Sequence, residues 1–401
     1  MVAMTVAEPL AGPAAAPPRS AAWRAGRRWL PCLPTLWPEM LVPRRRPEAP
    51  PFPFSAGRAR PYYFARNAVF HGARLLGLAG AEVLVPAYHH GVEVEALEAA
   101  GCQPAFVRVN ARMELDLEDL EARVGPRTRA LYVIHYAGFP QPMREIREIA
   151  RRAGLPVVED CALALYSCDG PVPLGLLGDL GVFCLYKTIP VPNGGLLVVN
   201  GELAGEPPPV LPAPLASTAS HAGGAMLANA AFRLGDAGQA LRQGGRRLAR
   251  AVRGAARVEH VSTGTMHFDP GAVDLGMSRL SAAIAANLDH REIVAARRRN
   301  YRLAQARLET LSPPVHPELP PGVCPLFYPF LCDDKDRLKR RLAARGVETV
   351  DFWRTGHPAC PAERFPEVAM LRRRVLELPI HQDLSPEDVA YLCDAVEESL
   401  A

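Results

Sequence analysis

The sequence predicts an α/β protein with a large domain built on a mostly parallel sheet, followed by a smaller C-terminal α+β domain. Between residues 62 and 160, short apolar runs alternate four times with amphipathic helical segments. This alternation is typical of parallel strands joined by right-handed crossovers and covered by helices on both faces. After residue 275, a long helical stretch precedes strand, helix and strand, and 401 residues are enough for two such domains.

Each element of the large domain follows from the period of its apolar residues. A first helix carries Val69, Ala73, Leu76 and Leu78. Strands are expected at 82–86, 105–109, 130–135 and 155–159, with helices at 92–100, 117–124 and 143–153 between them. Two further apolar runs, 178–187 and 195–200, flank a turn of prolines, an asparagine and two glycines, and they read as buried strands.

The remaining segments divide the chain as follows. Residues 1–28 read as a disordered tail, and 29–42, with two tryptophans among prolines, as an arm lying on the main domain. The large domain is expected at 29–275 and the small one at 276–401. The small domain has expected helices at 277–311, 337–345 and 386–400, the last capped by Ser385, and strands at 326–332, 347–352 and 375–381.

Residues 201–260 form an atypical insertion, rich in proline and then in arginine. Two helical segments are expected at 222–258, and the second places arginines opposite Leu241, Leu248 and Val252. A basic amphipathic helix can bind a membrane surface or an acidic partner. We favour the alternative that the apolar stripe packs on its own protein or on a partner subunit.

Composition narrows the class of protein. No run of 18 apolar residues occurs, so no membrane-spanning helix is expected. The nine cysteines are irregularly spaced and match neither a disulfide framework nor a metal site, which favours a reducing cytoplasm and no metal. The net charge of +4 comes from arginines interleaved with acids, and this pattern indicates solvated helix faces and no nucleic acid partner.

Lys187 is the first candidate for covalent chemistry. The chain has three lysines, Lys187, Lys335 and Lys339, among 46 basic residues, so arginine replaces lysine nearly everywhere that only charge is needed. A guanidinium stays protonated and cannot attack a carbonyl, whereas an amine can. Lys335 and Lys339 lie on an ordinary charged helix face, whereas Lys187 ends an apolar run.

Other polar side chains follow the strands that precede Lys187. Tyr88, His89 and His90 come after the first strand of the alternating series, His135 and Tyr136 after the third, and Asp160 after the fourth. Because ligands gather at the carboxyl ends of parallel strands, these side chains form a candidate site. Taken singly, His90 and His135 are more simply packing or capping residues.

Several ordered segments resemble the DegT/StrS-type sugar aminotransferases, which have the fold of aspartate aminotransferase (fold type I) and use pyridoxal phosphate. These segments are 82–88, 128–138, 157–162, 187–195 and 378–385. The resemblance covers roughly residues 60–200 and 275–398. It implies that Lys187 links covalently to the cofactor and moves protons, and that Asp160 keeps the pyridine nitrogen protonated.

The resemblance also implies further cofactor contacts. A ring from His89 or His90, with slight preference for His89, would stack on the cofactor. The turn Arg66, Asn67 and Ala68 would bind its phosphate at the start of a helix, although a plain N-cap by Asn67 is equally open. Cys184 stands where a phosphate-binding serine is common, and Leu163 where a polar residue often contacts the phenolic oxygen.

Weaker expectations concern substrate and assembly. Tyr88, Arg354 and His357 are candidates for substrate contact, whereas Arg279 is more simply structural. The segment 277–283 resembles the element that reaches the neighbouring subunit, which implies a homodimer with shared sites.

The resulting hypothesis is a transaminase that moves an amino group from a glutamate-like donor to a keto-sugar or related carbonyl compound, in polysaccharide or secondary-metabolite biosynthesis. The alternatives are another reaction on the same cofactor, such as a lyase or dehydratase reaction, and a non-catalytic binding protein. The departures at Cys184 and Leu163 put a nucleotide-sugar substrate in doubt.

Overall fold

The structure is a computed structural model, and it describes residues 28–43, 50–201, 203, 205–256 and 267–400. Side chains are described throughout these ranges except at 249–256. The expected disordered tail at 1–28 therefore lies, apart from Arg28, outside the described residues.

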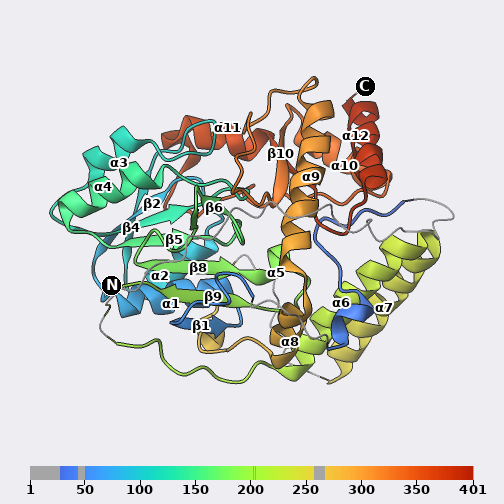
Figure 1. The fold of residues 1–401 in the computed structure, drawn as a ribbon, viewed down its shortest axis with the longest axis horizontal. Coiled ribbons are helices and arrows are strands. Elements are labelled where there is room, and N and C mark those ends of the chain that lie inside the picture. Colours follow the sequence, from blue (N-terminus) through green and yellow to red (C-terminus); the bar gives the residue numbers. More distant parts are fainter. Residues whose placement is uncertain (1–27, 44–49, 202, 204, 257–266, 401) are drawn as a thin grey trace.

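A seven-stranded sheet forms the centre of the molecule (Figure 1). Its strands are β1 (Ala59–Tyr62), β2 (Glu82–Pro86), β3 (Gln103–Val107), β4 (Thr128–Ile134), β5 (Val157–Asp160), β8 (Leu180–Cys184) and β9 (Gly195–Val199). The order is β1-β9-β8-β5-β4-β2-β3. The pairs from β3 through β2, β4 and β5 to β8 are parallel, and β9 runs antiparallel to both of its neighbours. The prediction of a mostly parallel sheet is confirmed.

Helices cover both faces of this sheet, as the crossover rule requires. The sheet order places α1 (Ala65–Leu75) and α2 (Val92–Ala99) on one face, and α3 (Leu117–Arg123) and α4 (Met143–Ala153) on the other. A short β-hairpin of β6 (Cys168–Asp169) and β7 (Val172–Pro173) follows β5, and η2 (Pro270–Ala272) lies before α8 (Arg279–Asn287). The strand interiors are apolar on both sides, for example Ala130 and Leu131 of β4, which point to opposite faces and are 0% and 1% exposed.

The C-terminal part surrounds a second apolar core. It contains α9 (His290–Leu308), β10 (Phe327–Leu331), α10 (Lys335–Ala344), η3 (Ala362–Arg364), α11 (Pro366–Arg374), β11 (Val375–Pro379) and α12 (Pro386–Leu400). β10 and β11 pair antiparallel. Ser385 caps α12 as expected: its hydroxyl accepts the Asp388 amide at 3.2 Å, and the Asp388 carboxylate accepts the Ser385 amide at 3.1 Å.

Two predictions about the C-terminal part are wrong. The helix expected at 277–311 is broken into α8 (Arg279–Asn287) and α9, because Leu288 is extended and Asp289 caps α9 by accepting the Glu292 amide at 3.0 Å. The strand expected at 347–352 is absent as a strand. Val347 instead bridges Leu30 of the N-terminal arm, and Val350 bridges Glu377.

The insertion folds as two helices, α6 (Leu215–Leu234) and α7 (Asp236–Ala256), which we call the hairpin. The N-terminal arm, residues 28–43 with η1 (Pro38–Leu41), packs against the hairpin and the second core. The Asn229 side chain donates to the Thr35 hydroxyl at 2.9 Å, and the Trp29 indole donates to Asp236 at 3.1 Å. No helix within the described ranges is long and apolar enough to cross a membrane.

Candidate functional site

Neighbouring strand ends bring the main candidate residues together. β8, β5, β4 and β2 are adjacent and parallel, so the segments after them emerge at one edge of the sheet. Lys187, Asp160 and His90 lie on these segments. Burial raises the pKa of Asp160 and lowers that of His90, and the nearby charge of Lys187 acts to lower both pKa values. The strand order thus places the three residues on segments that leave the same edge of the sheet.

The Asp160 carboxylate is held from both sides at the end of β5. The Tyr132 hydroxyl of β4 donates to Oδ2 at 2.6 Å, and the Ala162 amide donates to Oδ1 at 2.8 Å. Burial and the charge of Glu93 raise the pKa of Asp160, while the two hydrogen bonds and Lys187 oppose that rise. The fold presents a carboxyl group of fixed orientation, shielded from water, at the edge where ligands gather.

Lys187 lies in a single helical turn, α5 (Leu185–Thr188), between β8 and β9. The Leu185 amide donates to the Gly194 carbonyl at 2.9 Å, which fixes this turn against the start of β9. The lysine side chain is half-buried, and Nζ lies 5.0 Å from the centre of the Phe352 ring. An aromatic ring from the C-terminal part thus covers the amine.

Arg66 adds a buried positive charge near Tyr186 and Cys184, which precede Lys187 in the sequence. It is 7% exposed, and its guanidinium carbon lies 3.8 Å from the centre of the Phe64 ring. Burial lowers the pKa of Arg66, and the electrostatic effects of Tyr186 and Cys184 act in the opposite direction. No carboxylate among the described residues forms an ion pair with it. A buried cation without a counter-ion is costly, so the position suits an anionic ligand.

The start of α1 contributes backbone amides beside Arg66. Phe64 is the N-cap and gives no side-chain hydrogen bond to the first turn. The helix can begin here because position 195 is a glycine: a Cβ there would lie 2.2 Å from the carbonyl carbon of Phe64. The first amides of a helix and the positive end of its dipole favour a phosphate at this point.

The two other residues predicted for the phosphate turn are used differently. The Asn67 side chain donates to the Ala272 carbonyl at 2.8 Å, so it neither caps α1 nor faces an anion. The side chain of Ala68 is fully buried in the core. Of the predicted turn, the Arg66 side chain and the backbone remain available.

The geometry distinguishes the two candidate histidines. Both ring nitrogens of His89 are occupied: Nδ1 donates to the Pro86 carbonyl at 2.9 Å, and Nε2 accepts the His357 amide at 3.0 Å. Its ring stacks on Phe106. Burial lowers the pKa of His89 to about 4, consistent with a neutral ring. His90, in contrast, has a buried Nδ1 without a partner, which makes it the better candidate for a cofactor contact.

Tyr88 and Tyr136 form part of the contact between the loops after β2 and β4 and the C-terminal part, which we call the joint. The Tyr136 hydroxyl donates to the Tyr88 carbonyl at 2.6 Å, and the Tyr88 ring packs edge-on against Trp353 at 4.7 Å between ring centres. Arg372 of α11 donates to the carbonyls of Trp353, at 2.8 Å, and His89, at 3.0 Å. Tyr88 is 1% exposed, so it packs in this joint and does not offer a surface to substrate.

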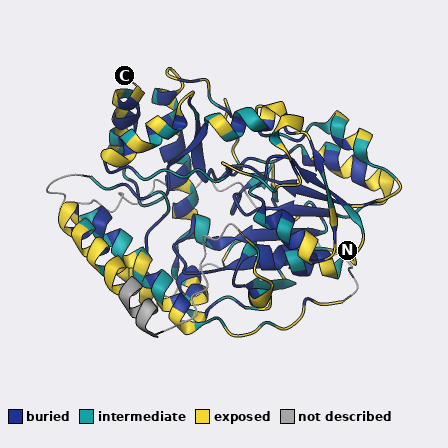
Figure 2. Cartoon of the chain, turned by 180° about the vertical axis from the view of Figure 1, so that it is seen from behind, coloured by how far each residue is buried: buried dark blue, intermediate teal, exposed yellow. Residues whose placement is uncertain are grey.

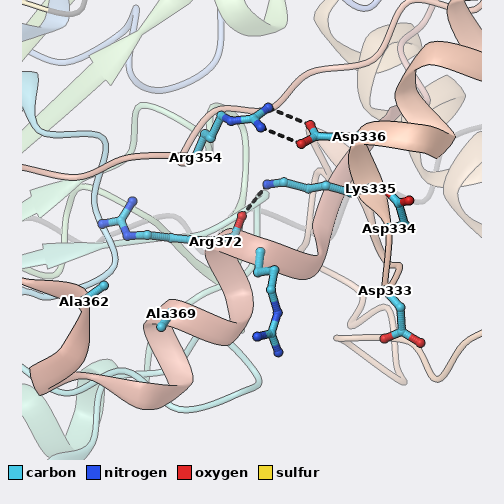
Figure 3. Close-up of a pocket in the computed structure, with 9 residues that line it drawn as sticks. Asp333, Asp334, Lys335, Asp336, Arg354, Ala362, Ala369 and Arg372 are labelled. Carbon is cyan, nitrogen blue, oxygen red and sulfur yellow. Dashed lines mark hydrogen bonds and ion pairs between the residues drawn. The ribbon is translucent and has the colours of Figure 1, made fainter.

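In the structure, the side chains of Arg354 and His357 pair with acidic residues rather than with Lys187. The Arg354 guanidinium forms a double ion pair with Asp336 of α10, at 2.7 and 2.6 Å (Figure 3). The His357 ring contacts the Glu98 carboxylate at 3.3 Å, and its backbone amide contacts His89. Both residues of the aromatic loop therefore have structural partners.

The two departures noted in the sequence are both buried. Burial raises the pKa of the Cys184 thiol, whereas Lys187 and a hydrogen bond with Tyr186 lower it. Cys184 therefore lies close to Lys187 and Arg66, but a thiol is a weaker hydrogen-bond donor than a serine hydroxyl. Leu163 is 4% exposed within the large core and offers no hydrogen bond.

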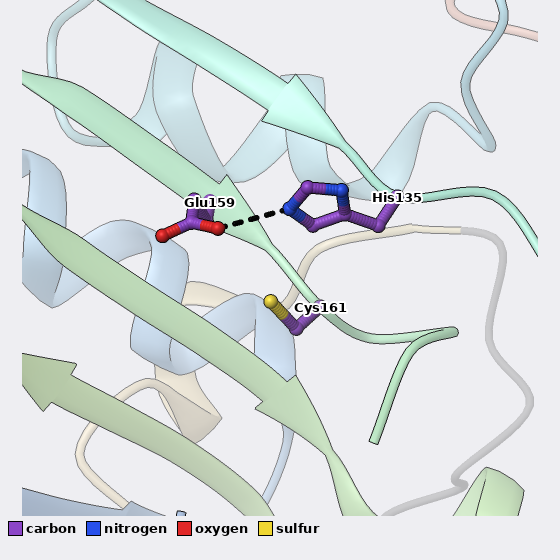
Figure 4. Close-up of side chains that lie close together, drawn as sticks. All are labelled: His135, Glu159 and Cys161. Atoms are coloured by element: carbon purple, nitrogen blue, oxygen red, sulfur yellow. Dashed lines mark hydrogen bonds and ion pairs between the residues drawn. The ribbon is translucent and has the colours of Figure 1, made fainter. Parts of the chain in front are cut away.

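Glu159 and Cys161, the sequence neighbours of Asp160, form a buried cluster with His135 (Figure 4). Potential ligand atoms of these residues lie within 4.8 Å of one another, as at a metal site. However, Glu159 already accepts hydrogen bonds from His135 at 3.0 Å and from the amides of Gly175 and Gly178. His135 Nδ1 also accepts the Gln141 amide. The cluster ties β4, β5 and the following loops together, which is the packing role expected for His135.

Sequence reasoning missed Tyr132, Phe352 and Arg372. Tyr132 lies within β4 rather than after it, and only the strand register, which pairs it with Val158 of β5, brings its hydroxyl to Asp160. Phe352 and Arg372 reach the site from the C-terminal part, far away in sequence. The one available signal was the aromatic character of residues 352 and 353.

Several known proteins are similar to this chain in sequence or in structure. GDP-perosamine synthase of Escherichia coli O157:H7 is 34% identical over 126 residues, which are 31% of this chain and 35% of the relative. The match thus spans about a third of the relative's length. The aminotransferase TlmJ of Streptoalloteichus hindustanus has a similar structure, with a TM-score of 0.59, 25% identity, and 86% of each chain covered.

A putative sugar aminotransferase of Streptococcus pneumoniae, Spr1654, shares the fold at 15% identity, with a TM-score of 0.62 over 85% of this chain and 87% of the other. It has been solved in PLP and PMP forms. The model of the DegT/DnrJ/EryC1/StrS aminotransferase family matches residues 67–207 and 223–397, most of the described chain, including the segments that carry Lys187, Asp160 and His90. The chain therefore belongs to the DegT/DnrJ/EryC1/StrS aminotransferase family.

Proposed function

We propose that this protein is a pyridoxal-phosphate-dependent aminotransferase that moves an amino group from a glutamate-like amino acid to a keto-sugar or related carbonyl compound. The observation that supports the proposal is that Asp160 ends β5 and Lys187 follows its parallel neighbour β8, so both lie at one edge of the sheet. Membership of an aminotransferase family supports the reaction class. The name of the relative GDP-perosamine synthase supports a nucleotide-linked sugar as acceptor.

The residues of the site fit the cofactor. Its phosphate would be bound by the Arg66 guanidinium and the first amides of α1, since both are positive and neither has an acidic partner. The unpartnered Nδ1 of His90 would face the cofactor. Asp160, held by Tyr132, would pair with the ring nitrogen.

Bound pyridoxal phosphate supplies an electron sink that stabilises negative charge next to the reacting amino group. The side chains supply binding and proton transfer. Asp160 Oδ would hold the ring nitrogen and its proton, and Lys187 Nζ would hold the cofactor and carry a proton to and from the reacting carbon. The Phe352 ring, 5.0 Å from Nζ, would cover one side of the amine.

We further propose a cytoplasmic homodimer with shared sites. All nine cysteines are free, as a reducing compartment favours. Near the site, α8 contacts the turn that follows Lys187. The backbone amide of Ser278, the N-cap of α8, donates to the side-chain oxygen of Asn193 at 2.8 Å. In the family that the sequence resembles, this helix reaches the neighbouring subunit. A partner subunit would therefore lie next to the site of each chain.

A half-reaction tests the proposed chemistry. Purified protein is loaded with pyridoxal phosphate, and its visible absorption is recorded before and after adding glutamate, and again after 2-oxoglutarate. We expect glutamate to convert the bound cofactor to its amine form and 2-oxoglutarate to reverse the change. A band that glutamate leaves unchanged would favour another donor or another reaction on this cofactor. Failure to bind the cofactor would favour a binding protein on the same fold.

A further inference from the structure

The helical turn α5 ends without support from its own backbone. It carries Lys187 and ends at Thr188, and we call it the lysine turn. In a longer helix, the Thr188 carbonyl would accept the amide of residue 192, four positions further on. That residue is a proline, which has no amide hydrogen, and a second proline stands at position 190. Because Thr188 is only 2% exposed, its carbonyl needs a donor from another part of the protein.

Two side chains of the C-terminal part supply this donor. Figure 1 shows α5 next to α9, and Nη2 of Arg297 in α9 donates to the Thr188 carbonyl at 3.0 Å. Nε2 of Gln382, from the segment after β11, donates to the same oxygen at 3.0 Å. Nε of Arg297 in turn donates to the side-chain oxygen of Gln382 at 2.9 Å. The three groups therefore close a ring of hydrogen bonds around the end of the lysine turn.

Arg297 is fully buried and has no acidic partner. Its side chain is 0% exposed. Figure 2 colours buried residues dark blue, and those of α9 include Ile293, Arg297, Asn300 and Tyr301. No carboxylate among the described residues forms an ion pair with Arg297, and burial lowers its pKa. A buried cation is costly and contributes little net stability, so stability alone does not account for an arginine at this position.

The shape of the guanidinium suits the acceptors that surround it. Nη1 donates to the Leu326 carbonyl at 2.9 Å, just before β10, while Nη2 reaches the Thr188 carbonyl. The planar group thus points its donors in fixed directions, which a lysine ammonium could not do. Hydrogen bonds from a charged donor are roughly twice as strong as those between neutral groups. Arg297 therefore ties the lysine turn firmly to the start of β10.

We propose that Arg297 and Gln382 are positioning residues that fix the end of the lysine turn and so hold Lys187 at the edge of the sheet. The inference rests on the proposed function in one respect, that Lys187 is the residue that binds the cofactor. A displacement of about 1 Å near a reacting group can lower a rate by about a hundredfold. Arg297 acts on the reaction through the backbone of Thr188, from a helix more than a hundred residues further along the chain.

Hydrogen exchange of the cofactor-free full chain tests whether the two side chains hold the turn. The Ile189 amide, which donates to the Leu185 carbonyl at 2.9 Å, reports opening of the lysine turn, and the amides of β4 report the stability of the whole fold. Arg297→Gln removes the guanidinium. We expect it to speed exchange at Ile189 by at least about tenfold more than exchange in β4.

Gln382→Glu is the second variant, because Gln382 is only half-buried and its replacement leaves the core intact. Glutamate keeps an oxygen that accepts Nε of Arg297, but it replaces the donor to Thr188 with a carboxylate oxygen. The two oxygens repel each other. We therefore expect exchange at Ile189 to accelerate in this variant too, by at least about tenfold relative to β4.

Arg298→Gln is the matched control, one position along α9. Arg298 also donates to backbone carbonyls, those of Pro320 at 2.7 Å and Val323 at 2.6 Å, and neither belongs to the lysine turn. Its exchange at Ile189 should match that of the wild type. In the protein loaded with pyridoxal phosphate, Gln382→Glu should lower kcat by about tenfold or more and leave KM for glutamate within about threefold. Arg298→Gln should change neither value.

The outcomes separate the two proposals. Wild-type exchange at Ile189 in folded Gln382→Glu overturns the positioning role, even if Arg297→Gln does not fold. Equal acceleration in Arg298→Gln overturns it as well, and so does an unchanged kcat in Gln382→Glu despite faster exchange. If the wild type binds no pyridoxal phosphate, the proposed function fails instead, while the exchange of the cofactor-free protein still decides whether Arg297 and Gln382 hold the turn.

Discussion

At the scale of the residue, we propose different tasks for Asp160 and Lys187, and single substitutions separate them. Asp160→Asn keeps the shape of the side chain and the hydrogen bond from the Ala162 amide. It removes the charge that, in the proposed mechanism, would hold a proton on the ring nitrogen. We expect kcat to fall by at least about a hundredfold while cofactor affinity changes little. Steady-state rates and cofactor titration measure the two effects, with Asp169→Asn as a control; a large loss of affinity with unchanged kcat would contradict this role.

Tyr132 is the second residue to test, because its hydroxyl donates to Asp160 at 2.6 Å. Burial raises the pKa of Asp160, and the Tyr132 hydrogen bond opposes that rise. Tyr132→Phe removes the donor, so the pKa of Asp160 should increase. Activity that needs ionised Asp160 is lost as pH falls, and in the variant this loss should begin at a higher pH. The pH profile of kcat/KM measures the shift, and superimposable acidic limbs for wild type and variant would refute it.

Lys187 and Asp160 could be predicted because their position after apolar runs is visible in the sequence. The choice of His90 over His89 could not, since it depends on the His357 amide, which approaches from 268 residues away. The contact of Tyr132 with Asp160 could not be predicted for a similar reason. Its sequence neighbours indicate a buried strand, and its hydroxyl meets Asp160 only through the parallel register of β4 and β5.

At the scale of the element, the contact between β9 and α1 positions the turn that we propose binds the cofactor phosphate. Gly195→Ala would place a Cβ 2.2 Å from the backbone of Phe64 and 2.4 Å from the Ala65 nitrogen. Because backbone cannot move aside cheaply, we expect a loss of about 3 kcal/mol or more in the free energy of unfolding, together with weaker cofactor binding. Urea unfolding measures the first effect.

Gly57→Ala is the matched control for this prediction. No heavy atom lies within 4 Å of a Cβ at Gly57, so its effect should stay within about 0.5 kcal/mol. Equal stabilities for the two variants would show that the close contact does not position α1.

Most elements of the large domain could be predicted, because strand and helix periods there are clear; 82–86 and 143–153 match β2 and α4. The break at Leu288 and Asp289 was missed because the apolar spacing continues across it, and only the capping carboxylate of Asp289 marks the new helix. Residues 347–352 have the composition of a strand, but their partners are single positions in the arm and in β11.

At the scale of the whole molecule, His89 links the loop after β2 to the C-terminal part by accepting the His357 amide. Burial lowers the pKa of His89 to about 4, below the ordinary value of 6.5. Because the unfolded state binds the proton more readily, the stability from neutral His89 is present above pH 6.5. It is lost as pH falls toward 4, at about 1.4 kcal/mol per pH unit.

His89→Gln tests this pH dependence. Glutamine keeps an acceptor oxygen but does not titrate between pH 7 and 4. Relative to the variant, the wild type should lose about 3 kcal/mol of unfolding free energy over this range. Urea unfolding at several pH values measures the difference, and parallel stability curves would exclude His89 as the titrating group.

The fold class of the whole molecule was predictable from the alternation of strands and helices, and the seven-stranded sheet confirms it. The contacts between the parts of the molecule could not be predicted from the sequence. Arg372, Phe352 and the N-terminal arm make contacts across hundreds of residues, and no local pattern reports them. The hairpin was recognisable as helical, but its exposed leucines became visible only once the packing of the arm was known.

The most direct test of the account is to find which lysine binds the cofactor. The protein is incubated with pyridoxal phosphate, reduced with borohydride and digested, and the modified peptide is identified by mass spectrometry. The account predicts one stable label at Lys187, lost together with the visible band in Lys187→Ala and retained in Lys339→Ala. A label shared equally with Lys335 or Lys339, or a band that survives in Lys187→Ala, would contradict it.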